Sequence, residues 1–425
     1  MNSNANTTDK TGVLSAAKDA LESLAEVMEP TLLQQNLFLS DRYGAKIYLK
    51  REDLTPVRSY KLRGAFNFFR KALAGGHRPP GFVCASAGNH AQGFAFACHH
   101  FDIPGVVFMP VTTPQQKIDK TYAFGQGKVE VKLIGDIFDV CNREALDYAE
   151  RNGWMMVPPF DHEDIIEGQS TVGLELLNQA DFPVDLLILP VGGGGLSSGV
   201  RRIMQAASPD TEIVYVEPAG APSLKRSLEK GERVVLREVD NFVDGASVAA
   251  IGERNFDSLR DVDPDAVMLI DEDELCETIV EFLNREGIVL EPAGALAIHA
   301  LRYVPAEKLA GRNVVCVTSG GNFDFERLPE VKERALRAAG LKKYLILRLP
   351  QRPGALKDFL NILGPADDIT RFEYLKKSAR NFGHILIGIE SREQGSFDAL
   401  FQRMDELGYT YSDITEDEAV ANFIV

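Results

Sequence analysis

One lysine, Lys61, lies where its amine could act as a nucleophile. It belongs to residues 59–65, SYKLRGA, and the apolar residues that follow have the spacing of a helix. Tyr60 supplies an aromatic ring beside it, and Arg63 supplies a nearby positive charge. A cation and partial burial both lower the pKa of a lysine, and a neutral amine can form a Schiff base with a carbonyl group. Because most lysines are solvated surface charges, this stretch alone leaves both roles open.

A run of four glycines forms the second chemically informative stretch. Gly192, Gly193, Gly194 and Gly195 follow an apolar strand-like run and precede Leu196 at the start of a helical pattern. Bare backbone can close around an anion, and a helix start adds free N–H groups and the positive end of its dipole. The run matches neither G-x-G-x-x-G nor a P-loop, so it predicts a site for a single phosphate. A flexible loop is the alternative, although each glycine costs backbone entropy on folding.

A third stretch, residues 85–93 with the sequence ASAGNHAQG, also follows an apolar run and opens a helix. Free backbone N–H groups at such a start bind a carboxylate or a phosphate, and three side chains add donors: Ser86, Asn89 and His90. Ordinary capping of the helix by Ser or Asn explains the same residues. Both interpretations stay open at this point.

The fourth stretch, residues 318–322 with the sequence TSGGN, ends another apolar run and carries the hydroxyl of Ser319. Taken alone, it is explained by a turn from strand to loop. Taken together, the four stretches supply an amine, a phosphate cradle, an anion-binding helix start and a hydroxyl. The ligand with an aldehyde for the amine and one phosphate is pyridoxal 5′-phosphate (PLP), and a lysine Schiff base is its expected anchor.

The elements that must position these residues alternate between strand and helix. Such alternation predicts open parallel sheets covered by helices, in two lobes, with ligands bound beyond the carboxyl ends of the strands. The expected strands are residues 46–50, 81–85, 105–109, 128–133, 186–191, 212–216 and 313–317.

After Gly340 the pattern changes to a strand, a helix, two strands, a helix and a last strand near Tyr409. This β-α-β-β-α-β order is that of a ferredoxin-like α+β domain. The expected parts are a disordered segment at residues 1–12, a catalytic domain at 13–340 whose small lobe (about 55–155) is inserted in the large one, and a regulatory domain at 341–425.

Composition narrows the class of protein. The chain has 425 residues and a net charge of −16, which argues against a nucleic-acid partner. Its apolar runs are too short to span a membrane, and its N-terminus lacks the apolar core of a signal peptide. Five scattered cysteines without a CxxC pair predict reduced thiols and a cytoplasmic protein. Glu217 is the one carboxylate in residues 217–223, EPAGAPS, so no metal site is predicted.

The four stretches together resemble the fold-type II PLP enzymes, whose catalytic fold is like that of the tryptophan synthase β subunit. Their order and spacing are similar to those of threonine/serine dehydratases. Residues 352–356, RPGAL, and 368–370, DIT, resemble a single ACT-like regulatory domain. This arrangement resembles the short form of the biosynthetic threonine dehydratases, and the resemblance covers nearly all of the chain after about residue 13.

The resemblance implies a role for each site residue. Lys61 would anchor PLP and remove the Cα proton, and Ser86 is counted with it among the catalytic residues. The cofactor contacts would come from Tyr60 beside the ring, Asn89 at the ring hydroxyl, the loop of Gly192, Gly193, Gly194, Gly195 and Leu196 at the phosphate, and Ser319 at the pyridine nitrogen. The substrate carboxylate would be held by Ser86, Ala87, Asn89 and His90.

The reaction implied is a PLP-dependent elimination that turns L-threonine into 2-oxobutanoate and ammonia, the first step of isoleucine biosynthesis. Isoleucine would act as feedback inhibitor near Gly354, Ala355 and Leu356, between paired domains of a homodimer or homotetramer. L-serine as a substrate, a catabolic serine/threonine dehydratase and a serine racemase stay open. From other classes, an amino-acid sensor with a vestigial catalytic half and a synthase that replaces a β-substituent also stay open.

Glu291, which opens residues 291–295 with the sequence EPAGA, has two possible roles. Its carboxylate could lie near the cofactor ring, or it could cap the helix that follows. The sequence does not decide between them.

Overall fold

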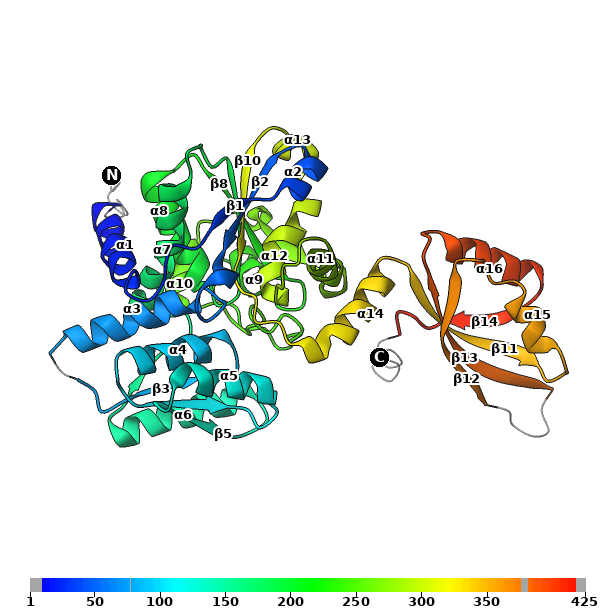
Figure 1. Cartoon of the computed structure of the whole chain (residues 1–425), viewed down its shortest axis with the longest axis horizontal. Helices are drawn as coiled ribbons and strands as arrows, with labels where there is room; N and C mark the ends of the chain where they lie inside the picture. The colour runs from blue at the N-terminus through cyan, green and yellow to red at the C-terminus, as the bar shows by residue number, and fades with distance from the viewer. Residues whose placement is uncertain (1–9, 77, 376–380, 418–425) are drawn as a thin grey trace. The chain divides into compact units, whose positions relative to one another are not determined.

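The computed structural model describes residues 10–76, 78–375 and 381–417. They form two compact units: one contains residues up to 272 together with 287–324, and the other contains 273–286 together with 325 onward. Among the described residues, no helix is both long enough and apolar enough to cross a membrane. Figure 1 labels the helices and strands.

The first unit contains a six-stranded sheet in its large lobe. The strand order is β1-β2-β10-β7-β8-β9, and all neighbours are parallel except β1 with β2. Helices α7 and α8 cover one face of this sheet and α12 the other (Figure 1). The strands are β1 (Leu33–Gln35), β2 (Lys46–Arg51), β7 (Leu186–Pro190), β8 (Glu212–Pro218), β9 (Val267–Ile270) and β10 (Asn313–Thr318).

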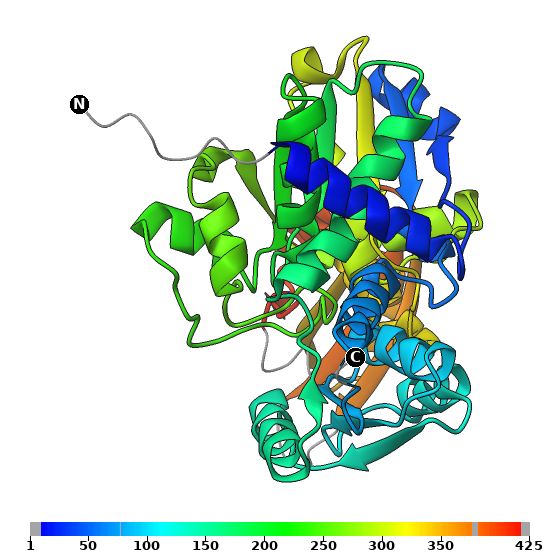
Figure 2. The ribbon, with the colours of Figure 1, turned by 90° about the vertical axis from the view of Figure 1, so that its left-hand side faces the viewer.

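The helices of the large lobe pack against this sheet and against one another. α1 lies across α7 and α8 (Figure 2, dark blue). The bounds are α1 (Lys10–Leu24), α2 (Leu37–Tyr43), α7 (Glu163–Gln179), α8 (Gly195–Ala207), α9 (Ser223–Lys230), α10 (Glu253–Leu259), α12 (Pro292–His299) and α13 (Ala306–Leu309), with short 3-10 turns at Glu52–Leu54, Pro264–Ala266 and Ala300–Arg302.

The small lobe has a four-stranded parallel sheet in the order β5-β4-β3-β6. Its core is aromatic: the rings of Phe69 and Phe82 lie 4.0 Å apart, and Phe94 packs edge-on against Phe69. Its elements are α3 (Lys61–Ala74), β3 (Phe82–Ala85), α4 (Asn89–His100), β4 (Gly105–Met109), α5 (Gln115–Gly125), β5 (Val129–Leu133), α6 (Phe138–Asn152) and β6 (Met155–Met156).

The second unit carries an antiparallel sheet in the order β12-β13-β11-β14. With two helices between its strands, it has the ferredoxin-like arrangement. α11 joins this unit for all but its first residue, and Asp273 on α11 forms ion pairs with Arg334 and Arg337 on α14. The elements are α11 (Glu272–Arg285), a 3-10 turn at Phe325–Arg327, α14 (Leu328–Ala338), β11 (Lys342–Pro350), α15 (Ala355–Leu360), β12 (Asp367–Leu375), β13 (Phe382–Ser391), α16 (Ser396–Glu406) and β14 (Thr410–Asp413).

The predicted fold class is confirmed: open parallel sheets in two lobes, followed by a ferredoxin-like domain. One local expectation needs correction. Residues 1–9 of the segment expected to be disordered lie outside the described residues, but residues 10–12 form the first turn of α1. The helix is anchored by its buried face, which includes Ala17, Ala20 and Leu24, and a helix held in this way can extend beyond its first buried residue.

A buried cluster of charges joins three elements of the first unit. The guanidinium of Arg63 on α3 contacts Glu52 and Glu175 at 2.7 Å each, and none of these side chains is more than 3 % exposed. Lys50, fully buried at the end of β2, pairs with Glu175 at 2.7 Å. Burial of a charge is tolerated only where it is paired and hydrogen-bonded. The cluster therefore fixes α3 against β2 and α7.

Arg63→Met should destabilise the protein by about 3–5 kcal/mol, because it leaves two buried carboxylates with too little positive charge. Urea denaturation of the purified protein measures the loss. Arg70→Met on the same helix is the matched control, since Arg70 is 29 % exposed and should cost less than about 1 kcal/mol. Equal losses in the two variants would contradict the role of the cluster.

Candidate active site

Lys61 is the first residue of α3, and its side chain is partly buried. Its Nζ donates a hydrogen bond to the carbonyl of Pro159 at 2.9 Å and lies 5.2 Å from the centre of the Tyr60 ring and 5.9 Å from that of Phe160. Desolvation lowers the pKa of Lys61 to about 8, although the Glu291 carboxylate opposes the shift. A substantial fraction of this amine is therefore neutral near physiological pH, and the solvated alternative is wrong.

Of the two predicted causes of the low pKa of Lys61, burial is confirmed and the nearby charge of Arg63 is not. Arg63 was expected to contribute through its charge, but its guanidinium is fully buried between Glu52 and Glu175. Two carboxylates thus balance that charge, and loss of water around Lys61 is the main cause of the shift.

The glycine run is packed, not flexible. A Cβ on Gly193 would lie 2.2 Å from the ring of Phe160, and Gly194 has φ +88°, a conformation that residues with side chains rarely adopt. The carbonyl of Gly193 accepts hydrogen bonds from Asn255 Nδ2 at 2.7 Å and from the N–H of Gly252 at 3.1 Å. The alternative of a flexible loop is therefore wrong.

This loop leads directly into α8, which begins at Gly195. The first N–H groups of a helix have no partner within it, and the positive end of the helix dipole lies there. A cradle of bare backbone at such a start fits a phosphate group.

The helix start at Asn89 is not capped by a side chain. α4 begins at Asn89, its cap residue is Gly88, and no side chain forms a capping hydrogen bond. Ser86 Oγ instead accepts from the N–H of Gly88 at 3.2 Å. The Asn89 amide donates to Glu291 Oε1 at 2.6 Å and accepts from Asn322 Nδ2 at 2.8 Å. Simple capping therefore does not explain this stretch, and its free N–H groups remain able to hold an anion.

His90 is buried and neutral. Its Nε2 lies 3.0 Å from the carbonyl of Val157. Desolvation, together with the nearby Lys61, lowers the pKa of His90 to about 3. The role of His90 in binding a substrate carboxylate stays a prediction, and it cannot rest on a positive charge of the ring.

Ser319 lies against the turn that carries Lys61. Its Oγ donates to the carbonyl of Ala293 at 3.1 Å, and its own carbonyl accepts from the N–H of Tyr60 at 3.1 Å. The next residue, Gly320, forms an antiparallel bridge with Ser59. The end of β10 and the start of α3 are thus held side by side.

The four predicted stretches therefore meet at one place in the first unit. Lys61 and Gly193 share the neighbour Phe160, and Asn89 packs against Gly320, the residue after Ser319. The arrangement fits PLP, since a desolvated amine, a backbone phosphate cradle and a buried serine lie together. The predicted effector residues Gly354, Ala355 and Leu356 belong to the second unit.

Several neighbours of the site were not assigned from sequence. Phe160 and Asn255 support the glycine run, but no local pattern marks either of them. Asn322 is the last residue of the TSGGN stretch, and this position was the only feature of the sequence that could have marked it as a site residue. Of the two possible roles of Glu291, the structure excludes capping: Glu291 occupies the cap position of α12, yet its side chain makes no capping hydrogen bond and accepts from Asn89.

Glu217 has a structural role. Its carboxylate accepts hydrogen bonds from the N–H groups of Leu224 at 2.7 Å and Lys225 at 2.9 Å, so it caps α9. Burial raises the pKa of Glu217 to about 7, against the effect of those bonds.

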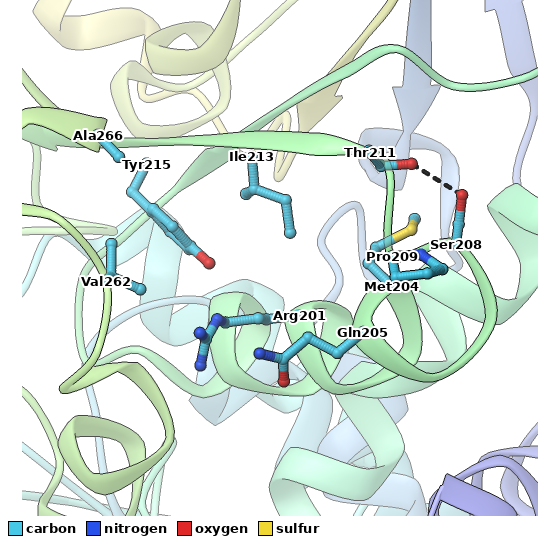
Figure 3. Close-up of a pocket in the computed structure, with 10 residues that line it drawn as sticks. All are labelled: Arg201, Met204, Gln205, Ser208, Pro209, Thr211, Ile213, Tyr215, Val262 and Ala266. Carbon is cyan, nitrogen blue, oxygen red and sulfur yellow. Dashed lines mark hydrogen bonds between the residues drawn. The ribbon is translucent and has the colours of Figure 1, made fainter.

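A separate cavity of about 230 Å³ lies beside the last turns of α8 (Figure 3). Arg201 and Gln205 of α8 line it together with Ile213 and Tyr215 of β8. The guanidinium of Arg201 is already engaged by Asp261 at 2.9 Å. None of the predicted site residues lines this cavity, so it is not the candidate active site.

The fold and the site define a class of protein: a two-lobed α/β enzyme that anchors PLP through a lysine. Comparison with known families agrees, because residues 24–320 match the pyridoxal-phosphate dependent enzymes and residues 333–424 match the C-terminal regulatory domain of threonine dehydratase. The chain therefore belongs to the pyridoxal-phosphate dependent enzyme family, and within it to the biosynthetic L-threonine dehydratases, whose similarity extends over nearly its whole length.

The similar proteins support both levels of this assignment. The chain is 45 % identical over 407 residues to the biosynthetic L-threonine dehydratases of Halalkalibacterium halodurans and Bacillus subtilis, covering 96 % of this chain and 97 % and 96 % of theirs. Among solved structures, the processed threonine deaminase isoform 2 from Solanum lycopersicum has 36 % identity and a TM-score of 0.73, covering 79 % of this chain and 96 % of that one. Maize serine racemase has 25 % identity and a TM-score of 0.68, covering 77 % and 98 %.

The pKa of Lys61 predicts how capture of PLP by the cofactor-free protein depends on pH. Only the neutral amine attacks an aldehyde, and this amine loses its proton near pH 8. The rate constant, followed by the visible absorbance of bound PLP, should rise with pH and level off above about 8. A rate that still climbs tenfold per pH unit between 8.5 and 10 would show an ordinary, solvated lysine.

Proposed function

We propose that this chain is a threonine ammonia-lyase that converts L-threonine to 2-oxobutanoate and ammonia, as the first step of isoleucine biosynthesis in the cytoplasm. The observation that carries the proposal is the desolvated amine of Lys61 beside a glycine cradle and a buried serine. Relatives named for this activity match almost the whole chain. All five cysteines are free and buried, as expected for a reducing compartment.

The proposed roles follow from the chemistry of each group. PLP, when bound, supplies an electron sink for the negative charge that develops at Cα. Lys61, in its neutral form, takes the Cα proton. The start of α4 holds the substrate carboxylate through its N–H groups, with Ser86, Ala87, Asn89 and His90 around it.

Ser319 supports elimination over transamination. A carboxylate facing the pyridine nitrogen would hold a proton there, whereas a neutral hydroxyl holds it more weakly. The Ser319 hydroxyl is also engaged by the Ala293 carbonyl at 3.1 Å. The weaker withdrawal of electrons favours prompt loss of the β-hydroxyl group.

L-serine is the second candidate substrate, because serine racemase is among the structural neighbours and shares the fold. It differs from threonine by one methyl group, and the residues that contact the β-carbon decide between the two substrates.

We also propose that isoleucine binds in the ferredoxin-like unit. A cavity of about 330 Å³ there suits an aliphatic amino acid, because it has apolar walls and the ammonium of Lys357 for the carboxylate, while Arg352 is paired with Asp358 at 2.7 Å. It includes the predicted effector residues. Its lining is Leu349, Pro350, Arg352, Gly354, Ala355, Leu356, Lys357, Leu360, Tyr374 and Ile385.

We propose that this unit pairs with a second copy in a homodimer or homotetramer. Two large apolar side chains on the sheet face opposite the buried core of this unit are exposed: Ile346 by 37 % and Phe382 by 40 %. Exposed apolar surface of this kind is typical of a face covered in an oligomer.

Lys61→Ala should abolish both threonine turnover and the visible absorbance of bound PLP, because the only proposed anchor and base is lost. Production of 2-oxobutanoate and the absorbance spectrum are measured in parallel, with L-serine as the competing substrate. Lys71→Ala, on the same helix but paired with Asp164 and Glu167, should retain both properties. Undiminished turnover in Lys61→Ala, or no turnover of threonine by the wild-type protein, would contradict the proposed threonine ammonia-lyase activity.

Leu356→Asp should raise the isoleucine concentration for half-inhibition at least tenfold, because a carboxylate replaces an apolar wall of the cavity. Uninhibited threonine turnover should stay within twofold of wild type, since the residue lies in the other unit. Leu407→Asp is the control: Leu407 is 62 % exposed and does not line the cavity. Unchanged inhibition in Leu356→Asp would place the effector elsewhere.

A further inference from the structure

We propose that Glu291 and Asn322 are positioning residues that lock the side-chain amide of Asn89 in one orientation, with an N–H group free to meet the ring oxygen of PLP. The inference deepens the proposed function and rests on it for the cofactor. It is carried by a chain of hydrogen bonds in which each partner determines the orientation of the next.

The series of hydrogen bonds starts at Asn322, and the neighbours of Asn322 determine the orientation of its amide. Its Nδ2 donates to the carbonyl of Val57 at 2.8 Å, and its Oδ1 accepts from the ammonium of Lys120 at 3.5 Å. A carbonyl can only accept and an ammonium can only donate. A flipped amide would lose both bonds, so Nδ2 of Asn322 must face Val57.

The orientation of Asn322 then determines that of Asn89. Nδ2 of Asn322 also donates to Oδ1 of Asn89 at 2.8 Å, so the amide nitrogen of Asn89 must face the other way. There it donates to Oε1 of Glu291 at 2.6 Å. An amide nitrogen carries two hydrogens, and Glu291 uses one of them. The second N–H remains available to a ligand, and an oxygen that needs a donor matches it.

The place of these groups fits this role. A Cβ on Gly320 would lie 2.1 Å from Glu291 Oε1 and 3.3 Å from Asn89 Nδ2, so the pair packs directly against the backbone after Ser319. Glu291 is only 6 % exposed, and its side chain does not cap α12. The buried carboxylate of Glu291 therefore leaves its own helix uncapped and accepts a hydrogen bond from Asn89 instead. A role in orienting the Asn89 amide explains this arrangement.

Burial also raises the pKa of Glu291 to about 7, and the nearby Asp244 adds to this effect, while the bond from Asn89 and the charges of Lys117 and Lys120 oppose it. Both forms of the carboxyl group can accept a hydrogen bond from an amide. The orientation of Asn89 therefore does not require Glu291 to be ionised.

Two variants should disturb the lock. Glu291→Leu removes the acceptor, and Asn322→Asp replaces the donor that faces Asn89 with a group that only accepts. Each should weaken PLP binding about tenfold, the loss typical of one hydrogen bond. Each should also change the visible absorption maximum and the circular dichroism of bound PLP, because the ring loses its fixed donor.

The conservative variant separates orientation from charge and packing. Glu291→Gln keeps an amide oxygen that accepts from Asn89, so its PLP affinity should stay within twofold of wild type, with an unchanged dichroism band. Glu253→Leu and Asn152→Asp make matched changes at exposed positions and should leave both readouts unchanged. Thermal unfolding of each cofactor-free variant identifies any that fails to fold, and Asn322→Ala, which also removes the donor, then replaces Asn322→Asp.

Wild-type affinity and dichroism in both Glu291→Leu and Asn322→Asp would overturn the proposal. So would a Glu291→Gln variant that is as impaired as Glu291→Leu, since charge and not orientation would then matter. Failure of the proposed function is distinguishable, because the wild-type protein itself would then bind no PLP or leave threonine unchanged.

Discussion

The active site depends on a cluster of buried charges that does not touch it. Arg63 is fully buried between Glu52 and Glu175, and Lys50 completes the set. Because charges without water are stable only when they are paired, these side chains hold the ends of β2 and α3 against α7. Lys61 lies two residues before Arg63 on the same helix, so the pairing of Arg63 also fixes the position of the Lys61 backbone. The amine lies against Pro159 and Phe160 and away from bulk water, which gives it its low pKa.

The glycine run is bare backbone because its neighbours leave no space for side chains. Phe160 packs on Gly193, and Asn255 packs on Gly194 and ties the carbonyl of Gly193. The amine, the cradle and the hydroxyl of Ser319 come from the start of α3, the start of α8 and the end of β10. In open α/β sheets these ends converge, and the two lobes of this unit place them around one small volume.

Regulation belongs to a unit with its own core. Leu345, Leu347, Phe359 and Ile387 are buried within the ferredoxin-like sheet and its helices. A cavity beside α15 and an exposed apolar sheet face lie in the same unit. A substitution in that cavity therefore lies in a separately packed unit and leaves the surroundings of Lys61 unchanged.

The sequence by itself predicted the fold class and the regulatory domain, and it singled out Lys61 and the glycine run as candidate site residues, because strand–loop–helix spacing and glycine-rich turns are local signals. Only the tertiary structure decided the roles of Arg63, Glu291 and Asn322. Glu291 lies 202 residues and Asn322 233 residues from Asn89 along the chain, and no local pattern records such a contact. Spacing also could not tell that Arg63 faces two buried carboxylates instead of Lys61. Burial and pairing are properties of the packed chain, and in this protein they set the pKa of Lys61 and orient the amide of Asn89.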